Sequence, residues 1–422
     1  MGLTGLWPLF NLYKQTKSFA EIAAEKGFVR NFNTFCTLTV GMDLSPILDS
    51  FQAKKIALGC KVLHSPTDLT QSQFFRLVSQ LSETTTCNIV IFDTVSRPRQ
   101  KRGTNVMVQK EPYHYDYAKP FIYPAGFHSH TAPGETDAEL AEMYKQGLID
   151  IVLTSDSDVF ALASVYSRNS KESKCWAELI VDLYDVPLIM QSLALSQEQF
   201  ILYALMVGND LDKGIPNCRP VLALGAAQAV SMLFLQQYNQ LSKAGHKNKV
   251  TKLLYQLKSE IIHIMKENPV GTLPHKAPAI ADFLHTHNFP LREPLDSFAH
   301  PLTSWTHSLN GPPAAPIWKP VISDVHKLVW CCQSSLKWSN KQVLDKFLNM
   351  VVLQKDVYYD YQDGTLRMVQ VMANSTPIPF SPDNLFIGQG FVQAVFSITN
   401  LMQQVLLALN LHQALHYATI QM

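Results

Sequence analysis

The stretch that decides the fold runs Ala-Pro-Gly-Glu-Thr-Asp-Ala-Glu over residues 132–139, then Gly-Leu-Ile-Asp-Ile-Val-Leu-Thr-Ser-Asp-Ser-Asp over residues 147–158. The first part predicts a helix start, because Pro133 suits a first helical position and acidic side chains there meet the positive end of the helix dipole. The second part predicts a short buried parallel strand that ends on two aspartates. Ligands of open parallel sheets bind beyond the carboxyl ends of the strands. Four carboxylates are therefore expected in one crevice: Glu135, Asp137, Asp156 and Asp158. The alternative is an ordinary acidic helix cap followed by a polar loop.

Two earlier apolar runs also end on a carboxylate. Residues 37–43 end on Asp43, residues 88–93 end on Asp93, and helical stretches separate the three strand-like runs. Asp210, which follows a predicted helix over residues 197–207, brings the number of expected acids to seven. Such a cluster repels itself unless cations bind within it. Ligand sets made only of oxygen favour Mg²⁺ or Mn²⁺ over zinc, and paired ions about 4 Å apart suit in-line displacement at a phosphodiester.

These residues resemble a known family. The chain is similar to the flap-endonuclease and xeroderma-pigmentosum group G superfamily of structure-specific nucleases, a Holliday-junction-resolvase-like branch included. One short motif is weak support, but six in matching order and approximate spacing are strong. They lie within roughly residues 1–235 and cover residues 1–7, 42–45, 92–93, 132–139, 153–158 and 207–216.

The resemblance implies a fold and a set of domains. The fold is α/β, with a parallel sheet flanked by helices in a PIN-like nuclease core. The expected domains are the nuclease core over residues 1–207 and a helix-hairpin-helix duplex-binding module over residues 208–266. A Pro-rich linker and a mixed, mainly helical C-terminal region of unassigned role then occupy residues 267–422.

The resemblance also implies a metal site. In the resembled family this site holds two Mg²⁺ ions, for which Mn²⁺ can substitute. The seven carboxylates of this chain would serve as the metal ligands and catalytic residues. The chain departs from the family in having Asp137 where Glu is usual, a side chain shorter by one methylene. The seven acids are Asp43, Asp93, Glu135, Asp137, Asp156, Asp158 and Asp210.

A basic and aromatic insertion separates Asp93 from Glu135. Cations beside aromatic side chains fit contact with single-stranded nucleic acid, and a solvated loop broken by prolines is the alternative. In the resembled family this insertion lies above the metals and steers the scissile phosphate, which gives Lys101 a catalytic role. The prolines leave little room for paired arch helices. The cations are Arg97, Arg99, Lys101 and Arg102, and the aromatic residues are Tyr113, Tyr115, Tyr117, Phe121 and Tyr123.

Further nucleic-acid contacts are expected at Gly2, Lys213 and Arg219. In the family, the turn after Asp210 opens a helix-hairpin-helix that grips duplex backbone with a bound K⁺. Here Asn217-Cys218-Arg219-Pro220 replaces the expected glycines. A left-handed conformation suits Asn but costs Arg free energy, so the K⁺ site is doubtful.

Composition limits the other function classes. Of 422 residues, 47% are hydrophobic and 16% are charged, as in a globular protein, and the net charge of +1 means that any DNA-binding surface is local. Seven cysteines without a C-x-x-C pattern predict reduced thiols and no zinc site. Residues 391–411 are long enough to span a bilayer, but their amide side chains favour a buried or partner-binding helix over a membrane anchor.

The predicted function is therefore a Mg²⁺-dependent endonuclease of DNA repair that acts in the nucleus on flaps, forks or junctions. Its partners are branched or flapped DNA and, through the C-terminal region, another protein. One alternative is a carboxylate-site ribonuclease on single-stranded RNA. The other is a non-catalytic nucleic-acid-binding scaffold, which the presence of all seven acids disfavours.

Overall fold

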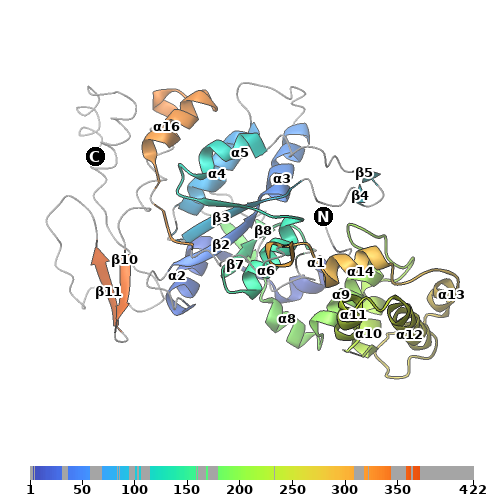
Figure 1. Ribbon diagram of the computed structural model, residues 1–422. Coiled ribbons are helices and arrows are strands. Elements are labelled where there is room, and N and C mark those ends of the chain that lie inside the picture. Colours follow the sequence, from blue (N-terminus) through green and yellow to red (C-terminus); the bar gives the residue numbers. More distant parts are fainter. Residues whose placement is uncertain are drawn as a thin grey trace.

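We analysed a computed structural model of the chain (Figure 1). It describes residues 3, 5–30, 37–57, 69–82, 84, 86–94, 100–101, 104–105, 115–157, 159, 168–169, 179–231, 233–307, 318–321, 323–343, 358–362 and 365–370. Asp158, Gly2, Arg97, Arg99 and Arg102 lie outside the described residues, and of Lys101 only the backbone is described.

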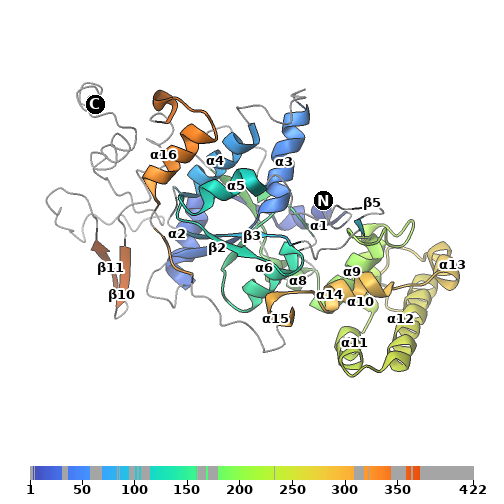
Figure 2. The ribbon, with the colours of Figure 1, turned by 45° about the horizontal axis from the view of Figure 1, so that its top comes forward.

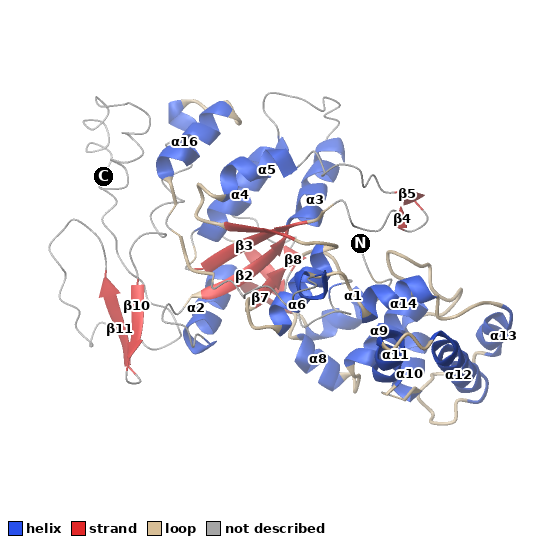
Figure 3. Cartoon of the chain, viewed as in Figure 1, coloured by secondary structure: helices blue, strands red, loops and turns tan. Residues whose placement is uncertain are grey.

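A four-stranded parallel sheet forms the centre of the molecule. Its order is β6 (His128–Thr131), β3 (Thr86–Phe92), β2 (Leu38–Asp43) and β7 (Ile151–Leu153). Every pair in this order is parallel, so all four strands end at the same edge. The predicted parallel α/β architecture is confirmed (Figure 3).

Alternate residues of the strands bury two cores on opposite faces of the sheet. Val90 and Phe92 join one core with α3 (Leu44–Ala57), α4 (Leu69–Ser82), α5 (Tyr115–Ile122) and α16 (Val325–Ser334). Ile89 and Ile91 join the other with α1 (Leu6–Phe10) and α6 (Thr136–Lys145) (Figures 1 and 2). This period of two is what a strand buried on both faces requires. At Gly41, an added Cβ would lie 2.6 Å from Leu140 of α6, so the helix packs directly onto the backbone of β2.

A second sheet is antiparallel and was not anticipated. It has the order β1 (Gln15–Ser18), β9 (Ile180–Leu183), β8 (Arg168–Asn169). The sequence of residues 18–26 predicts a helix closed by Gly27, but the observed helix α2 (Phe19–Arg30) continues through Gly27. The apolar sequence of residues 178–183 predicts a strand, and β9 occupies Ile180–Leu183.

The helical part of the molecule lies to one side of the sheet (Figure 1). The predicted helix over residues 197–207 is confirmed as α9, whose start is a capping box between Ser196 and Gln199. Residues 278–299, expected to be irregular, form two helices that bury Ile280, Leu284, Leu295 and Phe298. The helices of this part are α8 (Val186–Ser192), α9 (Gln197–Val207), α10 (Pro220–Ala229), α11 (Phe234–Lys243), α12 (Lys247–Glu267), α13 (Pro278–Thr286) and α14 (Arg292–Ala299).

Short elements complete the described chain. The sequence pattern predicts a helical segment over residues 322–350, but α16 ends at Ser334 and residues 335–339 are not helical. The strand-like pattern over residues 357–371 forms two antiparallel strands, residues 358–362 and 365–370. Of the described helices, none alone is long and apolar enough to cross a membrane; α10 and α11 satisfy the criterion only together, as a pair bent by 75°. Residues 391–411 lie outside the described part. The short elements are η1 (Asn11–Tyr13), β4 (Gln100–Lys101), β5 (Thr104–Asn105), α15 (Ser304–His307), β10 (Tyr358–Gln362) and β11 (Thr365–Gln370).

Candidate active site at the strand ends

Thr154 joins the ends of β2 and β7. Asp43 is the last residue of β2 and is only 3% exposed. The Thr154 hydroxyl donates a hydrogen bond to Asp43 Oδ2 at 3.1 Å and accepts one from the backbone N–H of Asp156, also at 3.1 Å. The acid that ends β2 and the acid that follows β7 are therefore held on the two sides of one hydroxyl.

The carboxylate of Asp93 fastens the start of α6 to the end of β3. Its Oδ1 accepts hydrogen bonds from the backbone N–H of Thr136 at 2.9 Å and from the Thr136 hydroxyl at 2.8 Å. Glu135 and Asp137 flank Thr136 in the sequence, so this contact brings both to the strand ends. The helix begins at Thr136, with Glu135 as its N-cap, so Pro133 precedes the first turn instead of occupying it.

The other oxygen of Asp93 is held by two hydroxyls. The hydroxyls of Ser45 and Tyr115 lie 2.8 Å and 3.3 Å from Asp93 Oδ2 and also contact each other, so their two protons are shared among these three contacts. Tyr115 is fully buried. Burial, and then the negative charge of Asp93, raises the pKa of Tyr115 well above its usual range, so the phenol remains a donor.

Tyr115 and Phe121 therefore do not stack on bases, and that interpretation of the insertion is wrong for both. They belong to α5, where Tyr115, Ala118, Phe121 and Ile122 are all buried. These residues recur at the helical spacing of three to four, which is the sequence signal that the prolines obscured. Tyr123, just beyond α5, is 68% exposed.

We expect Thr136→Val to destabilise the protein by about 1.5–3 kcal/mol, because it removes a hydrogen bond to a charged group at a buried position while preserving the side-chain shape. Thr136 is 2% exposed. Urea denaturation measures the difference. Thr136→Ser, which retains the hydroxyl, is the matched control. Equal stability of the two variants would show that the Thr136 hydroxyl does not hold Asp93.

A tight turn after α9 positions Asp210. The side-chain oxygen of Asn209 accepts hydrogen bonds from the backbone N–H groups of Leu211 at 2.8 Å and Asp212 at 3.0 Å. The backbone N–H of Asn209 donates to the backbone oxygen of Asp212 at 2.8 Å. Gly208 enters the turn with φ 93° and ψ 149°, a region open almost only to glycine. Asp210 is 8% exposed at this turn.

The next turn avoids the conformational cost that was expected at Arg219. Asn217 is the residue that adopts the left-handed conformation, with φ 62°, whereas Arg219 is extended and caps α10. Arg219 and Lys213 are both exposed. The turn therefore forms although Asn217 and Arg219 stand where the resembled family has glycines, and it exposes the Arg219 side chain.

The donors present fit a hard divalent cation in chemistry. Five described acids lie at the sheet edge or are tied to it, and they offer only oxygen atoms, which Mg²⁺ and Mn²⁺ prefer. Within the described part of the chain, no three His, Cys, Asp or Glu side chains already surround a common point as a ligand set. Instead, Asp43 and Asp93 accept hydrogen bonds from neighbouring hydroxyls. The seven-acid metal site therefore stays a prediction.

Sequence reasoning missed Glu139 and the partners of two histidines. His130 Nε2 lies 2.7 Å from Oε1 of the fully buried Glu139, whose Oε2 accepts a hydrogen bond from the backbone N–H of Ser304 at 2.8 Å. His128 Nε2 lies 2.6 Å from Lys319 O. A sequence segment far from the acid motifs thus packs against them. A separation of 165 residues gives no local signal of such a contact.

Comparison with known proteins agrees with this geometry. The XPG I-region family matches residues 126–210, which include the acid motifs of α6 and β7 and Asp210. Residues 126–210 thus carry an XPG I-region. The sequence resemblance to the flap-endonuclease superfamily is confirmed.

Two sequence relatives show how far the superfamily similarity extends. Flap endonuclease 1 of Eremothecium gossypii is 33% identical over 119 residues, which are 28% of this chain and 31% of that protein. Flap endonuclease GEN of Drosophila melanogaster is 35% identical over 83 residues, 18% of this chain and 11% of the relative. The matched region thus spans less than a third of either relative.

Solved structures of the superfamily are similar over most of the chain. The eukaryotic junction-resolving enzyme GEN-1 with cesium has a TM-score of 0.62 and 23% identity, over 84% of this chain and 78% of that one. The catalytic core of Rad2 in complex with a DNA substrate has a TM-score of 0.53 and 18% identity, over 83% and 99% of the two chains. At these identities the similarity establishes the fold.

Proposed function

We propose that the protein is a Mg²⁺-dependent, structure-specific DNA endonuclease that hydrolyses phosphodiesters at flaps, forks or junctions. One observation carries the proposal: hydrogen bonds made by Thr136 and Thr154 draw acid motifs from distant segments to one edge of the parallel sheet. Carboxylates held together in this way need a cation to offset their repulsion. Relatives named flap endonuclease, and a GEN1 structure in complex with product DNA and Mg²⁺, support the same activity.

The acids would hold two divalent ions. Such ions, when bound, activate water and neutralise charge at the scissile phosphate. The chain's own residues position the ligands: Thr154 sets Asp43 against the backbone of Asp156, and Thr136 sets the first turn of α6 against Asp93. The proposed ligands are Asp43, Asp93, Glu135, Asp137, Asp156, Asp158 and Asp210.

Basic residues would orient the nucleic acid. Lys101, with Arg97, Arg99 and Arg102, is proposed to steer the scissile phosphate toward the acids, with Gly2 nearby. Exposed Lys213 and Arg219 would contact the duplex backbone at the turn before α10. We propose that the guanidinium of Arg219, rather than a bound K⁺, supplies the charge at this turn.

The proposal extends to partners and location. Branched or flapped DNA in the nucleus would be the substrate, in a repair reaction. The residues from 267 onward would include a protein-binding segment toward the C-terminus, beyond a nuclease core over residues 1–207 and a duplex-binding module over residues 208–266.

A cleavage panel tests the proposal. Purified full-length protein is incubated with flap, fork, four-way-junction and single-stranded RNA substrates, with Mg²⁺ and with chelator. The expected result is cleavage of branched DNA that depends on Mg²⁺. Cleavage confined to RNA would favour the ribonuclease alternative, and binding without cleavage of any substrate would favour the scaffold.

A further inference from the structure

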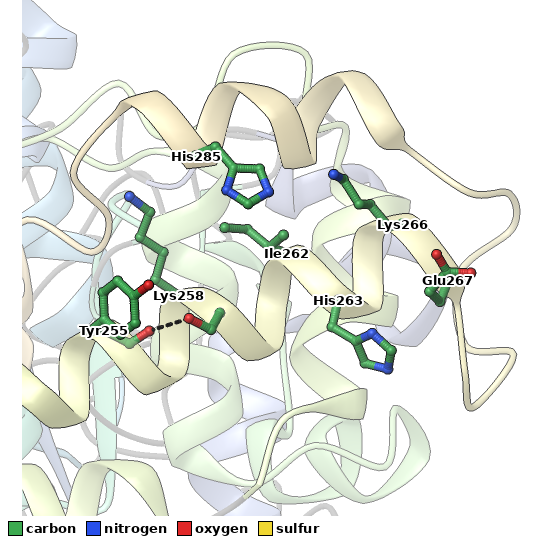
Figure 4. A pocket seen from close by; sticks show the side chains of 8 residues that line it. Tyr255, Lys258, Ile262, His263, Lys266, Glu267 and His285 are labelled. Carbon is green, nitrogen blue, oxygen red and sulfur yellow. Dashed lines mark hydrogen bonds between the residues drawn. The ribbon is translucent and has the colours of Figure 1, made fainter.

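A cavity of about 320 Å³ lies between α12 and α13, in the helical part of the molecule (Figure 4). Ile262 of α12 forms its floor below His285 of α13, and Lys258 and Lys266 stand on either side of His285. The three α12 residues are four apart, so they share one face of the helix, and the two lysines lie about 12 Å apart along its axis.

The charge around the cavity is locally positive. Residues 243–287 contain seven lysines and three acids, an excess of four, although the whole chain has a net charge of only +1. The acid in the lining, Glu267, is paired with Lys276 at 3.2 Å. Lys266 pairs with the exposed Asp282 at 3.5 Å, and such surface pairs contribute little free energy, so Asp282 can be replaced by a phosphate. No ion pair involving Lys258 occurs in the described part of the chain.

An exposed aromatic side chain completes the cavity. Tyr255 lies one turn before Lys258 and lines the same space, yet 69% of it is exposed. A tyrosine with a large exposed surface beside lysines offers a base-stacking platform next to phosphate contacts, which is the combination that binds single strands. A duplex keeps its bases stacked inside and would not use the ring.

We propose that the groove formed by Tyr255, Lys258, Ile262, Lys266 and His285 binds single-stranded nucleic acid, with a base on Tyr255 and the backbone between Lys258 and Lys266. The lysines contact phosphates, and Ile262 supplies an apolar surface beneath the sugar or base. This site is separate from the acid cluster and does not depend on the proposed cleavage. It would hold an unpaired arm of a branched substrate.

Binding of a labelled oligothymidylate to the full chain, followed by fluorescence anisotropy in chelator, tests the site without cleavage. Tyr255→Ala is expected to raise the Kd roughly 5- to 100-fold, as loss of one stacked base does. Lys258→Ala is expected to lower the slope of log affinity against log salt by about 0.7, one phosphate contact on a single strand. Tyr255→Phe retains the ring and is expected to bind like the original protein.

Lys252→Ala is the matched control. Lys252 is an exposed lysine of the same helix that does not line the cavity and lies about 9 Å before Lys258 along the helix axis. It is expected to change the Kd less than twofold. Photo-crosslinking of a 4-thiothymidine oligonucleotide locates the strand, and crosslinks are expected within residues 247–286.

Three results would overturn the assignment. They are an unchanged Kd for Tyr255→Ala, an equal loss for Lys252→Ala and Lys258→Ala, and crosslinks found only outside residues 247–286. The Tyr255→Ala substitution could also weaken binding of a hairpin duplex as much as binding of the single strand. That result would contradict the assignment as well, because stacking on the ring requires an unpaired base.

Discussion

Asp156→Ala is expected to reduce Mg²⁺-dependent cleavage by at least about 1,000-fold without unfolding the protein. Loss of a metal ligand removes several kcal/mol of transition-state stabilisation, and each 1.4 kcal/mol corresponds to about tenfold in rate. The backbone N–H of Asp156, not its carboxylate, makes the contact with Thr154, so the link between the ends of β2 and β7 survives the substitution. Single-turnover cleavage of a branched substrate measures the effect.

Stability and metal binding provide independent readouts. Removing one negative charge from a crowded acid cluster relieves repulsion, so the Tm of Asp156→Ala in chelator should equal or exceed that of the original protein. Its affinity for Mn²⁺, measured by electron paramagnetic resonance, should fall. Asp116→Ala, which removes an exposed acid of α5, is the control and should change neither activity nor Mn²⁺ binding. Undiminished turnover by Asp156→Ala would exclude Asp156 from the active site.

The strand ends could be predicted from sequence because their signals are local. The apolar runs that form β2, β3 and β7 each end within three residues of a carboxylate, and parallel pairing then places those carboxylates at one edge. Thr136 and Thr154 were within the quoted motifs but carried no signal of their own. Their roles depend on side-chain directions that only the packed structure defines.

The prolines misled the sequence interpretation of residues 267–299. Pro278 is the first residue of α13 and Pro294 the third of α14. In the first turn of a helix the missing N–H has no intrahelical partner to lose, so proline there marks a helix start instead of a linker. Pro120 lies inside the buried helix α5, where tertiary packing by Phe121 and its neighbours outweighs the local preference.

Gly208→Ala is expected to destabilise the protein by at least about 3 kcal/mol and to abolish cleavage. The backbone conformation of Gly208 would cost a residue with a side chain roughly 1–3 kcal/mol of conformational free energy. The added Cβ would also lie 2.5 Å from the backbone oxygen of Lys213, which cannot move without opening the turn. Gly214 has no room for a side chain either, because a Cβ added there would lie 2.4 Å from the backbone nitrogen of Gly208. The absence of a side chain at both glycines therefore allows the backbone segments before and after Asp210 to pack directly against each other.

Gly245→Ala separates backbone strain from this steric effect. Gly245 also has a positive φ, 68°, but nothing lies within 4 Å of the Cβ that alanine would add. Its substitution should cost about 1–2 kcal/mol of strain, partly offset by a stiffer unfolded chain, and should leave cleavage intact. Thermal melts and cleavage rates of both variants measure the contrast. If Gly208→Ala were no less stable and no less active than Gly245→Ala, the turn would tolerate a side chain, and the position of Asp210 would not depend on the close approach of Gly208 to Lys213.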